Sequence, residues 1–209
     1  MKILIACEYS AIVRDAFRAR GHNAWSCDLE PTEGNRRWHI QGDVLGILNG
    51  GWDMMIAHPE CRYLCNSGIK HLYKGGKKIN GPCPERWLNF AKAGQFFLEL
   101  WGADIPLKVL ENSEMHTYAV QVLGMENRGG LHQILQLWMF GTKEQKSTHT
   151  WRTENLPELT ETDNVYDEMM KLPKKERSKC HYQSPGKDRG KRRSKFDPKM
   201  AAAMAEQWG

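Results

Sequence analysis

Four short apolar segments, each followed at once by polar side chains, constrain the fold of this chain more than any other feature. They are residues 3–7, 22–27, 52–57 and 107–110. Residues 11–20 and 84–101 lie between the first pair and the last pair, and both carry apolar side chains at helical spacing. Strands that alternate with helices predict an α/β domain with a mostly parallel sheet and helices on both of its faces.

The C-terminal half extends this pattern and divides the chain. Apolar segments at 131–140 and 148–152 are further predicted strands, whereas the Gly-, Lys- and Asn-rich stretch at 66–84 predicts a loop. Asp197 as N-cap and Pro198 at the first helical position predict a last helix. We therefore expect three parts: an α/β core over 1–152, a polar, basic and irregular insertion over 153–196, and a helix over 197–209 that returns to the core.

The formal net charge of +5 is unevenly distributed. Residues 171–199 hold 12 Lys and Arg against 3 Asp and Glu, while the rest of the chain holds 18 basic and 22 acidic side chains. A basic stretch on a mildly acidic body indicates a polyanionic partner, or a solvated tail.

Composition also limits the compartment. No apolar run approaches the roughly 18 residues of a membrane helix, and the N-terminal run lacks the pattern of a signal peptide. Six cysteines among 209 residues are too few for a disulfide scaffold, so we expect a reducing cytoplasm.

Polar side chains follow the four main strands where each one ends. In parallel sheets the carboxyl ends of the strands share one edge, and ligands bind beyond that edge. We therefore expect one site there, built from Cys7-Glu8-Tyr9-Ser10, Asp28, His58-Pro59-Glu60-Cys61 and Glu111-Asn112.

Two aspartates near this edge have a binding interpretation and a structural one. A carboxylate such as Asp28 at the end of the second strand can accept both hydroxyls of a ribose, or can cap a turn. Asp43 can accept from an adenine amino group, or can cap the short turn after Gly42.

Cys61 and Glu111 form the sharper pair. A thiolate at Cys61 is a candidate nucleophile, and Glu111 can donate or accept a proton across the same cleft. A zinc site is the competing interpretation, with Cys61, Cys65, His71 and Cys83 as ligands, although their spacing fits no common zinc motif.

The order and spacing of these motifs resemble DNA cytosine-5 methyltransferases, and particularly the short phage-encoded proteins that are similar to that family. His58-Pro59-Glu60-Cys61 resembles its Pro-Pro-Cys motif, and Glu111-Asn112-Ser113 resembles Glu-Asn-Val. Gln145 and Lys146 lie where a Gln-x-Arg-x-Arg region is expected. The resemblance implies a Rossmann-like methyltransferase sheet with S-adenosylmethionine as cofactor. It assigns cofactor contacts to Cys7, Glu8, Tyr9, Ser10, Asp28, Asp43 and Pro59.

The resemblance also implies a mechanism. Cys61 would attack C6 of cytosine in DNA, Glu111 would protonate N3, and C5 would take the methyl group before elimination releases Cys61. The base must first leave its stack, at a cost of a few kcal/mol. A protein of this kind would act in the cytoplasm of an infected bacterial host.

Several residues depart from the family pattern. Residues 7–13 contain no glycine, and Ala11 stands where one is expected. Glu60 replaces a proline, and its charge would oppose a thiolate at Cys61. Lys146 and Thr148 replace the arginines of the later motif.

The insertion is too short for a full target-recognition domain. The alternatives are a catalytically degraded fold that acts as a nucleotide- or DNA-binding phage regulator or counter-defence protein, and a methyltransferase of a free nucleotide. We expect DNA or a nucleotide as the partner and no bound metal.

Basic side chains in two regions are the candidates for phosphate contacts, which give affinity without sequence choice. The alternative for the second region is a disordered basic connector. The candidates are Lys70, Lys74, Lys77 and Lys78 in the loop, Lys146, and Lys187, Arg189, Lys191, Arg192 and Arg193 in the insertion.

Overall fold

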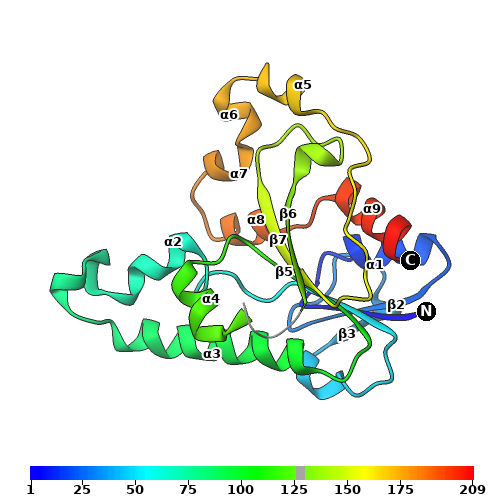
Figure 1. Ribbon diagram of the computed structural model, residues 1–209, viewed down its shortest axis with the longest axis horizontal. Coiled ribbons are helices and arrows are strands. Elements are labelled where there is room, and N and C mark those ends of the chain that lie inside the picture. Colours follow the sequence, from blue (N-terminus) through cyan, green and yellow to red (C-terminus); the bar gives the residue numbers. More distant parts are fainter. Residues whose placement is uncertain (126–129) are drawn as a thin grey trace.

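The computed structural model describes residues 1–125 and 130–209, and a seven-stranded sheet forms its centre (Figure 1). The strand order is β3-β2-β1-β4-β5-β7-β6. Strands β1 to β5 are parallel, and β7 is antiparallel to both of its neighbours, so the expected mostly parallel sheet is confirmed. The strands are Lys2–Ala6 (β1), Asn23–Asp28 (β2), His39–Gln41 (β3), Met54–Ala57 (β4), Leu107–Asn112 (β5), Leu131–Gln136 (β6) and Ser147–Arg152 (β7).

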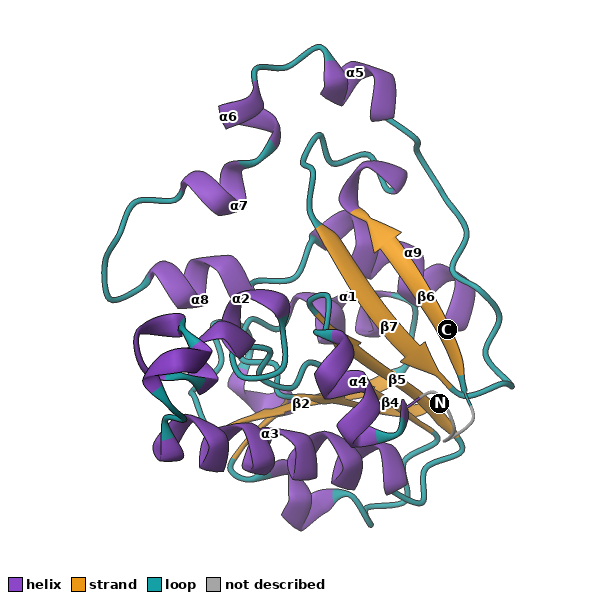
Figure 2. Ribbon diagram, turned by 60° about the vertical axis from the view of Figure 1, so that its left-hand side comes forward, coloured by secondary structure: helices purple, strands orange, loops and turns teal. Residues whose placement is uncertain are grey.

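Helices cover both faces of the sheet, as the alternation of elements predicts (Figure 2). Helices α1 and α9 pack on one face, and α3 and α4 pack on the other. The helices are Ile12–Ala19 (α1), Asn66–Ile69 (α2), Pro84–Gly102 (α3), Thr117–Leu123 (α4), Tyr166–Met170 (α5), Lys174–Arg177 (α6), Lys179–Tyr182 (α7), Arg189–Ser194 (α8) and Pro198–Trp208 (α9).

Alternation along the buried strands explains these two layers. In β1, Ile3 and Ile5 belong to the cluster beneath α1 and α9, whereas Leu4 and Ala6 belong to the cluster beneath α3 and α4. Successive side chains of a strand point to opposite faces, so a continuous apolar run requires a cover on each side.

Some local predictions need correction. The predicted strand 131–140 ends at Gln136 and continues as a 3-10 turn, and the predicted loop 66–84 contains α2 and further short helical turns. The predicted cap of the last helix is confirmed, because Asp197 accepts hydrogen bonds from the N–H groups of Lys199 and Met200.

The insertion predicted to be irregular carries the four short helices α5 to α8. Its first residues belong to the core, since Leu156 and Leu159 are buried in the α1/α9 cluster. Helices α5, α6 and α7 extend beyond the ends of β6 and β7 in both ribbon views. Within the described ranges, no helix is long and apolar enough to cross a membrane. All six cysteines are free.

Candidate functional site

The carboxyl edge of the parallel strands brings the predicted motifs together. The order reverses between β1 and β4, because β1 leads to β2 on one side and β4 and β5 continue on the other. Ligands of doubly wound sheets bind at such a switch point. Burial raises the pKa of the Cys7 thiol, and so do the nearby carboxylates of Asp28 and Asp43, so these three residues share one region.

The loop between β1 and α1 has a glycine-like backbone without glycine. Cys7 has φ of 59° and Ala11 has φ of 66°, and they are the two non-glycine residues with positive φ in the described chain. L-residues adopt this region at a cost, and such outliers gather at functional sites. The chain therefore takes the left-handed turns there despite the missing glycines.

Glu8 is turned into the protein. Its side chain is buried, and its two carboxylate oxygens accept the N–H groups of Val13 at 2.7 Å and Arg14 at 3.2 Å. These are orphan donors at the start of α1, where the helix dipole favours an anion. Burial raises the pKa of Glu8, although these hydrogen bonds and the nearby charge of His58 act to lower it. Glu8 thus fixes the shape of the loop, and a contact with cofactor stays a prediction.

Asp28 and Asp43 each cap a turn, which was the structural interpretation predicted for both residues. Asp28 Oδ1 accepts from the N–H of Glu30 at 2.9 Å, and Asp43 Oδ1 accepts from the N–H of Leu45 at 3.0 Å. Burial raises the pKa of Asp28. Each cap uses one carboxylate oxygen, so it is compatible with a second bond to a ribose hydroxyl or an adenine amino group.

Asn112 connects the end of β5 to the segment that carries Cys61. Its side chain is buried, and its amide donates to the backbone oxygen of Pro59 at 3.2 Å. The backbone oxygen of Cys61 accepts from the N–H groups of Leu64 and Cys65 at 3.1 and 3.0 Å. These bonds hold Cys61 in a tight turn beside β5.

Cys61 and Cys65 form a pair that sequence reasoning did not recognise as such. The hydrogen bond to Cys65 and burial raise the pKa of Cys61, and the charge of Glu111 adds to this. The hydrogen bond from Cys61, then the Ser67 hydroxyl and the backbone N–H groups at the start of α2, lower the pKa of Cys65 to about 5. The pKa values of the two thiols are therefore shifted in opposite directions. The sequence carried no signal for this role, because the stretch that follows Cys65 was predicted to be a loop and holds the short helix α2.

Glu60, which was expected to oppose a thiolate at Cys61, forms an ion pair with a neighbouring residue. Its side chain is exposed, and Oε1 lies 3.1 Å from Nε of Arg62. Glu111 is the carboxylate that contributes most to raising the pKa of Cys61. Glu111 on the neighbouring strand therefore adds a minor effect, after the larger effects of Cys65 and of burial.

Glu111 is held by donors at both of its carboxylate oxygens. His58 Nδ1 lies 3.0 Å from Oε2, and the Thr148 hydroxyl donates to Oε1. Burial would raise the pKa of Glu111, but the hydrogen bond and charge of His58, the Thr148 bond and the charge of Lys146 together lower it. Thr148 thus contacts Glu111 from β7, where the family motif has an arginine. Sequence reasoning placed His58 within its motif but gave it no role.

The proposed zinc ligands do not converge. Within the described ranges, which include Cys61, Cys65, His71 and Cys83, no three His, Cys, Asp or Glu side chains are grouped closely enough to hold a metal ion. Cys65 instead contacts Ser67, with 3.2 Å between Sγ and Oγ.

Residues 187–196, which we call the basic strap, fold onto the predicted cofactor loop. The Tyr9 hydroxyl donates to the backbone oxygen of Lys191 at 2.9 Å. Lys191 Nζ lies 3.6 Å from a carboxylate oxygen of Glu30, and Lys195 Nζ lies 2.7 Å from Glu33. The strap therefore makes defined contacts with the loop after β1 and with residues 30–33.

The strap also reaches the catalytic candidates. The ring of Phe196 lies 4.9 Å from that of His58, between centroids, and Lys146 donates to the backbone oxygen of Arg193 at 3.3 Å. Several arginines of the strap, which are candidates for phosphate contacts, donate hydrogen bonds to other residues of this chain. Arg189 donates to Gln183 and His181, Arg192 to Ser184, and Arg193 to Cys180.

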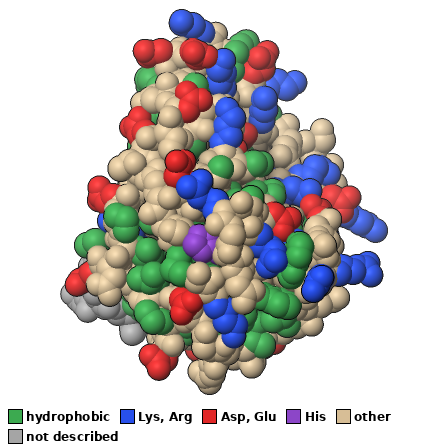
Figure 3. Space-filling model, turned by 90° about the vertical axis from the view of Figure 1, so that its right-hand side faces the viewer, with side chains coloured by type: hydrophobic (Ala, Val, Ile, Leu, Met, Phe, Trp, Pro, Cys, Tyr) green, Lys and Arg blue, Asp and Glu red, His purple; other side chains and the backbone are tan. Residues whose placement is uncertain are grey.

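The lysines of the predicted loop are exposed. Lys70, Lys74, Lys77 and Lys78 follow Cys65 along a segment that projects to one side of the body in Figure 1. Ile79 beside them is 92% exposed. On the face shown in Figure 3, Lys and Arg side chains gather over the upper part and one flank, with acidic side chains among them.

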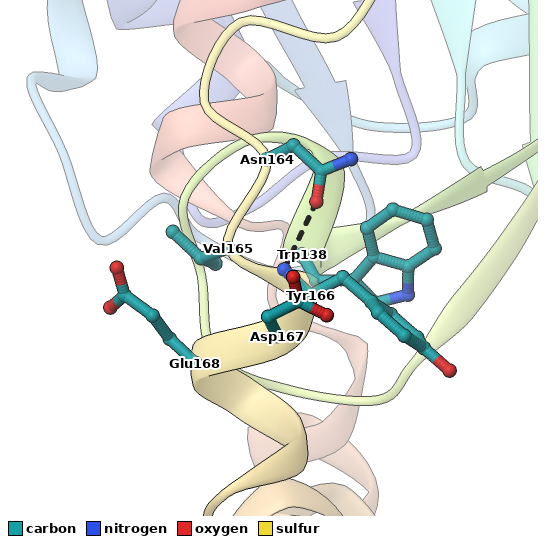
Figure 4. A pocket seen from close by; sticks show the side chains of 6 residues that line it. All are labelled: Trp138, Asn164, Val165, Tyr166, Asp167 and Glu168. Carbon is teal, nitrogen blue, oxygen red and sulfur yellow. Dashed lines mark hydrogen bonds between the residues drawn. The ribbon is translucent and has the colours of Figure 1, made fainter.

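Two open hollows lie apart from these residues. One, of about 520 Å³, is lined by residues of the β6–β7 connection and the insertion, and Figure 4 shows Trp138 and Tyr166 on one side of it, with centroids 5.0 Å apart. The other, of about 470 Å³, lies between α3 and α4. Neither is lined by a residue predicted for catalysis or cofactor binding.

The fold and the carboxyl-edge site define a doubly wound, Rossmann-like α/β protein. No family model and no curated protein matches the sequence.

Solved structures of DNA cytosine methyltransferase-like proteins are similar to it. One is described as a DNA modification methyltransferase encoded within an E. coli prophage (14% identity, TM-score 0.46, covering 83% of this chain and 56% of that one). Others are S. pombe Dnmt2 methyltransferase (12%, 0.43, 88% and 56%) and the Entamoeba histolytica methyltransferase EhMeth (15%, 0.48, 78% and 57%). This chain thus matches little more than half the length of each.

Proposed function

We propose that this protein transfers a methyl group from S-adenosylmethionine to C5 of cytosine in DNA, with Cys61 as the nucleophile. The observation that carries the proposal is the placement of Cys61 and Glu111 at the ends of adjacent strands, β4 and β5, beside the switch-point loop at residues 7–10. A thiol and a carboxyl group on one edge are the two groups that addition to a pyrimidine ring needs.

The switch-point loop fits the cofactor. The left-handed backbone at Cys7 and Ala11 shapes a turn against which a ligand can lie, and Asp28 and Asp43 each keep an oxygen for the ribose or the adenine. Tyr9, Ser10 and Pro59 would complete the wall of this site. When bound, S-adenosylmethionine supplies an electrophilic methyl group.

The residues of the chain would move protons and form one bond. Cys65 accepts the proton of Cys61 as the Cys61 sulfur attacks C6 of a cytosine extruded from its stack. Glu111 delivers a proton to N3, and electron density moves to C5. After methylation, the C5 proton passes to solvent water and the double bond between C5 and C6 re-forms. Cys61 leaves as a thiolate and takes its proton back from Cys65.

The basic segments would hold the DNA backbone. Lys70, Lys74, Lys77 and Lys78 lie just after the catalytic turn, and the basic strap lies over the cofactor loop. Phosphate contacts of this kind give affinity without reading sequence. Such a protein would act in the cytoplasm of an infected bacterial host.

The test is the nucleoside content of DNA incubated with protein and cofactor, measured by mass spectrometry. Wild type and Cys83→Ser, a matched cysteine variant outside the pair, should produce 5-methylcytosine, and Cys61→Ser should produce none. Equal product from Cys61→Ser and wild type would refute the nucleophile. The same assay with free deoxycytidine nucleotides separates a nucleotide methyltransferase from one that acts on DNA.

A second candidate is a binding protein on the same fold that has lost the transfer step. The raised pKa of Cys61 and the strap packed against Tyr9 favour it. Calorimetry with S-adenosylmethionine distinguishes the two. Binding supports the methyltransferase, whereas DNA binding without any cofactor binding at millimolar concentration supports the second candidate.

A further inference from the structure

His58 is fixed between two strands at the centre of the site. It follows β4 directly, and its N–H donates to the backbone oxygen of Ala6 in the neighbouring strand at 3.0 Å. Its ring nitrogen Nδ1 lies 3.0 Å from Glu111 Oε2, and the two side chains are 12% and 18% exposed. The position and orientation of the ring are therefore set by the sheet itself.

The bonds at Glu111 determine where the hydrogens lie. An ionised carboxylate is acceptor-only, and Glu111 accepts from the Thr148 hydroxyl at one oxygen and faces His58 at the other. His58 must therefore carry its hydrogen on Nδ1. In this state Glu111 has no proton of its own to give to N3 of cytosine.

Two carboxyl groups and an aromatic ring surround His58. Its charge acts on the carboxyl groups of Glu8 and Glu111, which face it from the β1–α1 loop and from β5. Lys146 is the cation on the far side of Glu111. Phe196 of the strap stacks on the ring, and the buried Nε2 has no hydrogen-bond partner among the described residues.

We propose that His58 is a positioning residue that stores the proton which Glu111 delivers to N3, an inference that rests on the proposed function. As the bond between Cys61 and C6 forms, the doubly protonated ring of His58 passes its Nδ1 proton to Glu111 Oε2 and keeps the hydrogen on Nε2, and the Glu111 hydroxyl passes a proton on to N3. When elimination breaks the bond between Cys61 and C6, the proton returns from N3 through Glu111 to His58. Protons and charge balance over the cycle, because the C5 proton that passes to solvent is the one proton released by methyl transfer.

The first test needs no activity. Imidazole nitrogen NMR of the full chain reports which ring nitrogen carries hydrogen when the ring is neutral. We expect His58 to carry it on Nδ1 in the wild type and to change to Nε2 in Glu111→Ala. A wild-type ring protonated only on Nε2 would overturn the proposal.

The second test separates the role of the proton stored by His58 from the role of its hydrogen bond to Glu111. In His58→Asn the amide nitrogen replaces Nδ1 as donor to Glu111 but does not titrate, and His181→Asn is the same change at an exposed histidine. We expect His58→Asn to lower kcat by about 10²–10⁴, the usual contribution of a proton-transfer group, and to leave KM for DNA nearly unchanged. Wild-type kcat should fall as pH rises through the range of imidazole, and the residual kcat of His58→Asn should not follow this limb.

Two contrary outcomes differ in meaning. Wild-type kcat and pH profile in His58→Asn would overturn the role of His58 and leave the methyltransferase intact. Absence of 5-methylcytosine from the wild type would overturn the proposed function itself. His58→Phe, which lacks any donor, should lose more activity than His58→Asn, and equal kcat values in the two would show that the hydrogen bond to Glu111 has no part.

Discussion

The pKa values of Cys61 and Cys65 are shifted in opposite directions although the two residues are neighbours. Cys65 lies at the start of α2, where the Ser67 hydroxyl and backbone N–H groups stabilise its thiolate, whereas Cys61 faces Glu111. The thiol proposed to attack cytosine is thus the one with the raised pKa, and Cys65 is the base proposed to activate it.

The opposite pKa shifts of the two thiols predict how the pair titrates. Because the pKa of Cys65 is lowered to about 5 and that of Cys61 is raised, one thiolate should form at about pH 5 and should remain alone through neutral pH. The ultraviolet absorbance of thiolate measures it. Cys65→Ser should abolish this step, while Cys83→Ser should retain it. A first thiolate that appears only near the pKa of an ordinary cysteine would contradict the assignment.

The strained backbone at Ala11 predicts an unusual response to glycine. Glycine adopts positive φ without strain, so Ala11→Gly should recover about 1–2 kcal/mol that offsets the methyl group it removes. Ala16→Gly in the middle of α1 has no such gain and should lose about 1 kcal/mol. Urea unfolding of both variants gives the comparison. Equal losses of unfolding free energy at the two positions would show that Ala11 is not strained.

Sequence reasoning found single residues better than pairs. Cys61, Glu111 and Asp28 were predicted as candidates because each lies at the end of a predicted strand or just beyond it, which is a local pattern. The roles of His58 and Cys65 depend on partners that only the fold brings near, namely Glu111 across two strands and Cys61 across a turn. Such contacts have no signature in the spacing of residues along the chain.

At the scale of elements, long periodic segments were predicted well and short ones were missed. The helix at 84–101 and the four main strands appear within a few residues of their expected bounds. Strand β3 has three residues, too few to show alternation. Helix α4 begins after His116, whose ring accepts the N–H of Tyr118, and histidine is not among the usual cap residues.

The projecting loop predicts a salt-dependent effect. Lys74, Lys77 and Lys78 are exposed, so replacing all three by alanine should reduce the slope of log affinity for DNA against log salt by about 3, since each phosphate that a lysine neutralises adds about 0.9 to that slope. The matched control removes three basic charges from the insertion instead, by alanine at Lys171, Lys174 and Lys175. Filter binding over a salt series measures both. An equal slope in the loop variant and the wild type would exclude the loop from the DNA interface.

At the scale of the whole molecule, the insertion has two parts that lie in different places. Its helices α5 to α7 extend past β6 and β7, and its basic strap folds back over the switch point to reach Tyr9 and His58 (Figure 1). The strap covers the loop that is proposed to bind cofactor, so binding of cofactor and movement of the strap should be linked.

This linkage predicts faster exchange of cofactor when the strap is loosened. Half-exposed ion pairs contribute about 0.2–1 kcal/mol each, so Glu30→Gln with Glu33→Gln should speed S-adenosylmethionine association and dissociation by a factor of roughly two to thirty. Stopped-flow fluorescence measures both rates. Glu168→Gln breaks a similar ion pair, to Lys143 in the β6–β7 connection, and should have no effect. Unchanged rates in the double variant would mean that the strap does not gate the site.

The most direct measurement traps the covalent bond. DNA that contains 5-fluorocytosine is incubated with protein and S-adenosylmethionine, and the adduct is digested and mapped by mass spectrometry. Fluorine at C5 cannot leave as a proton does, so elimination stops and the bond between sulfur and C6 persists. We predict a methylated 5-fluorocytosine adduct on the peptide that contains Cys61, with the modified atom assigned to Cys61 by fragmentation. An adduct on Cys65, or ordinary cytosine methylation without any adduct, would contradict Cys61 as the nucleophile.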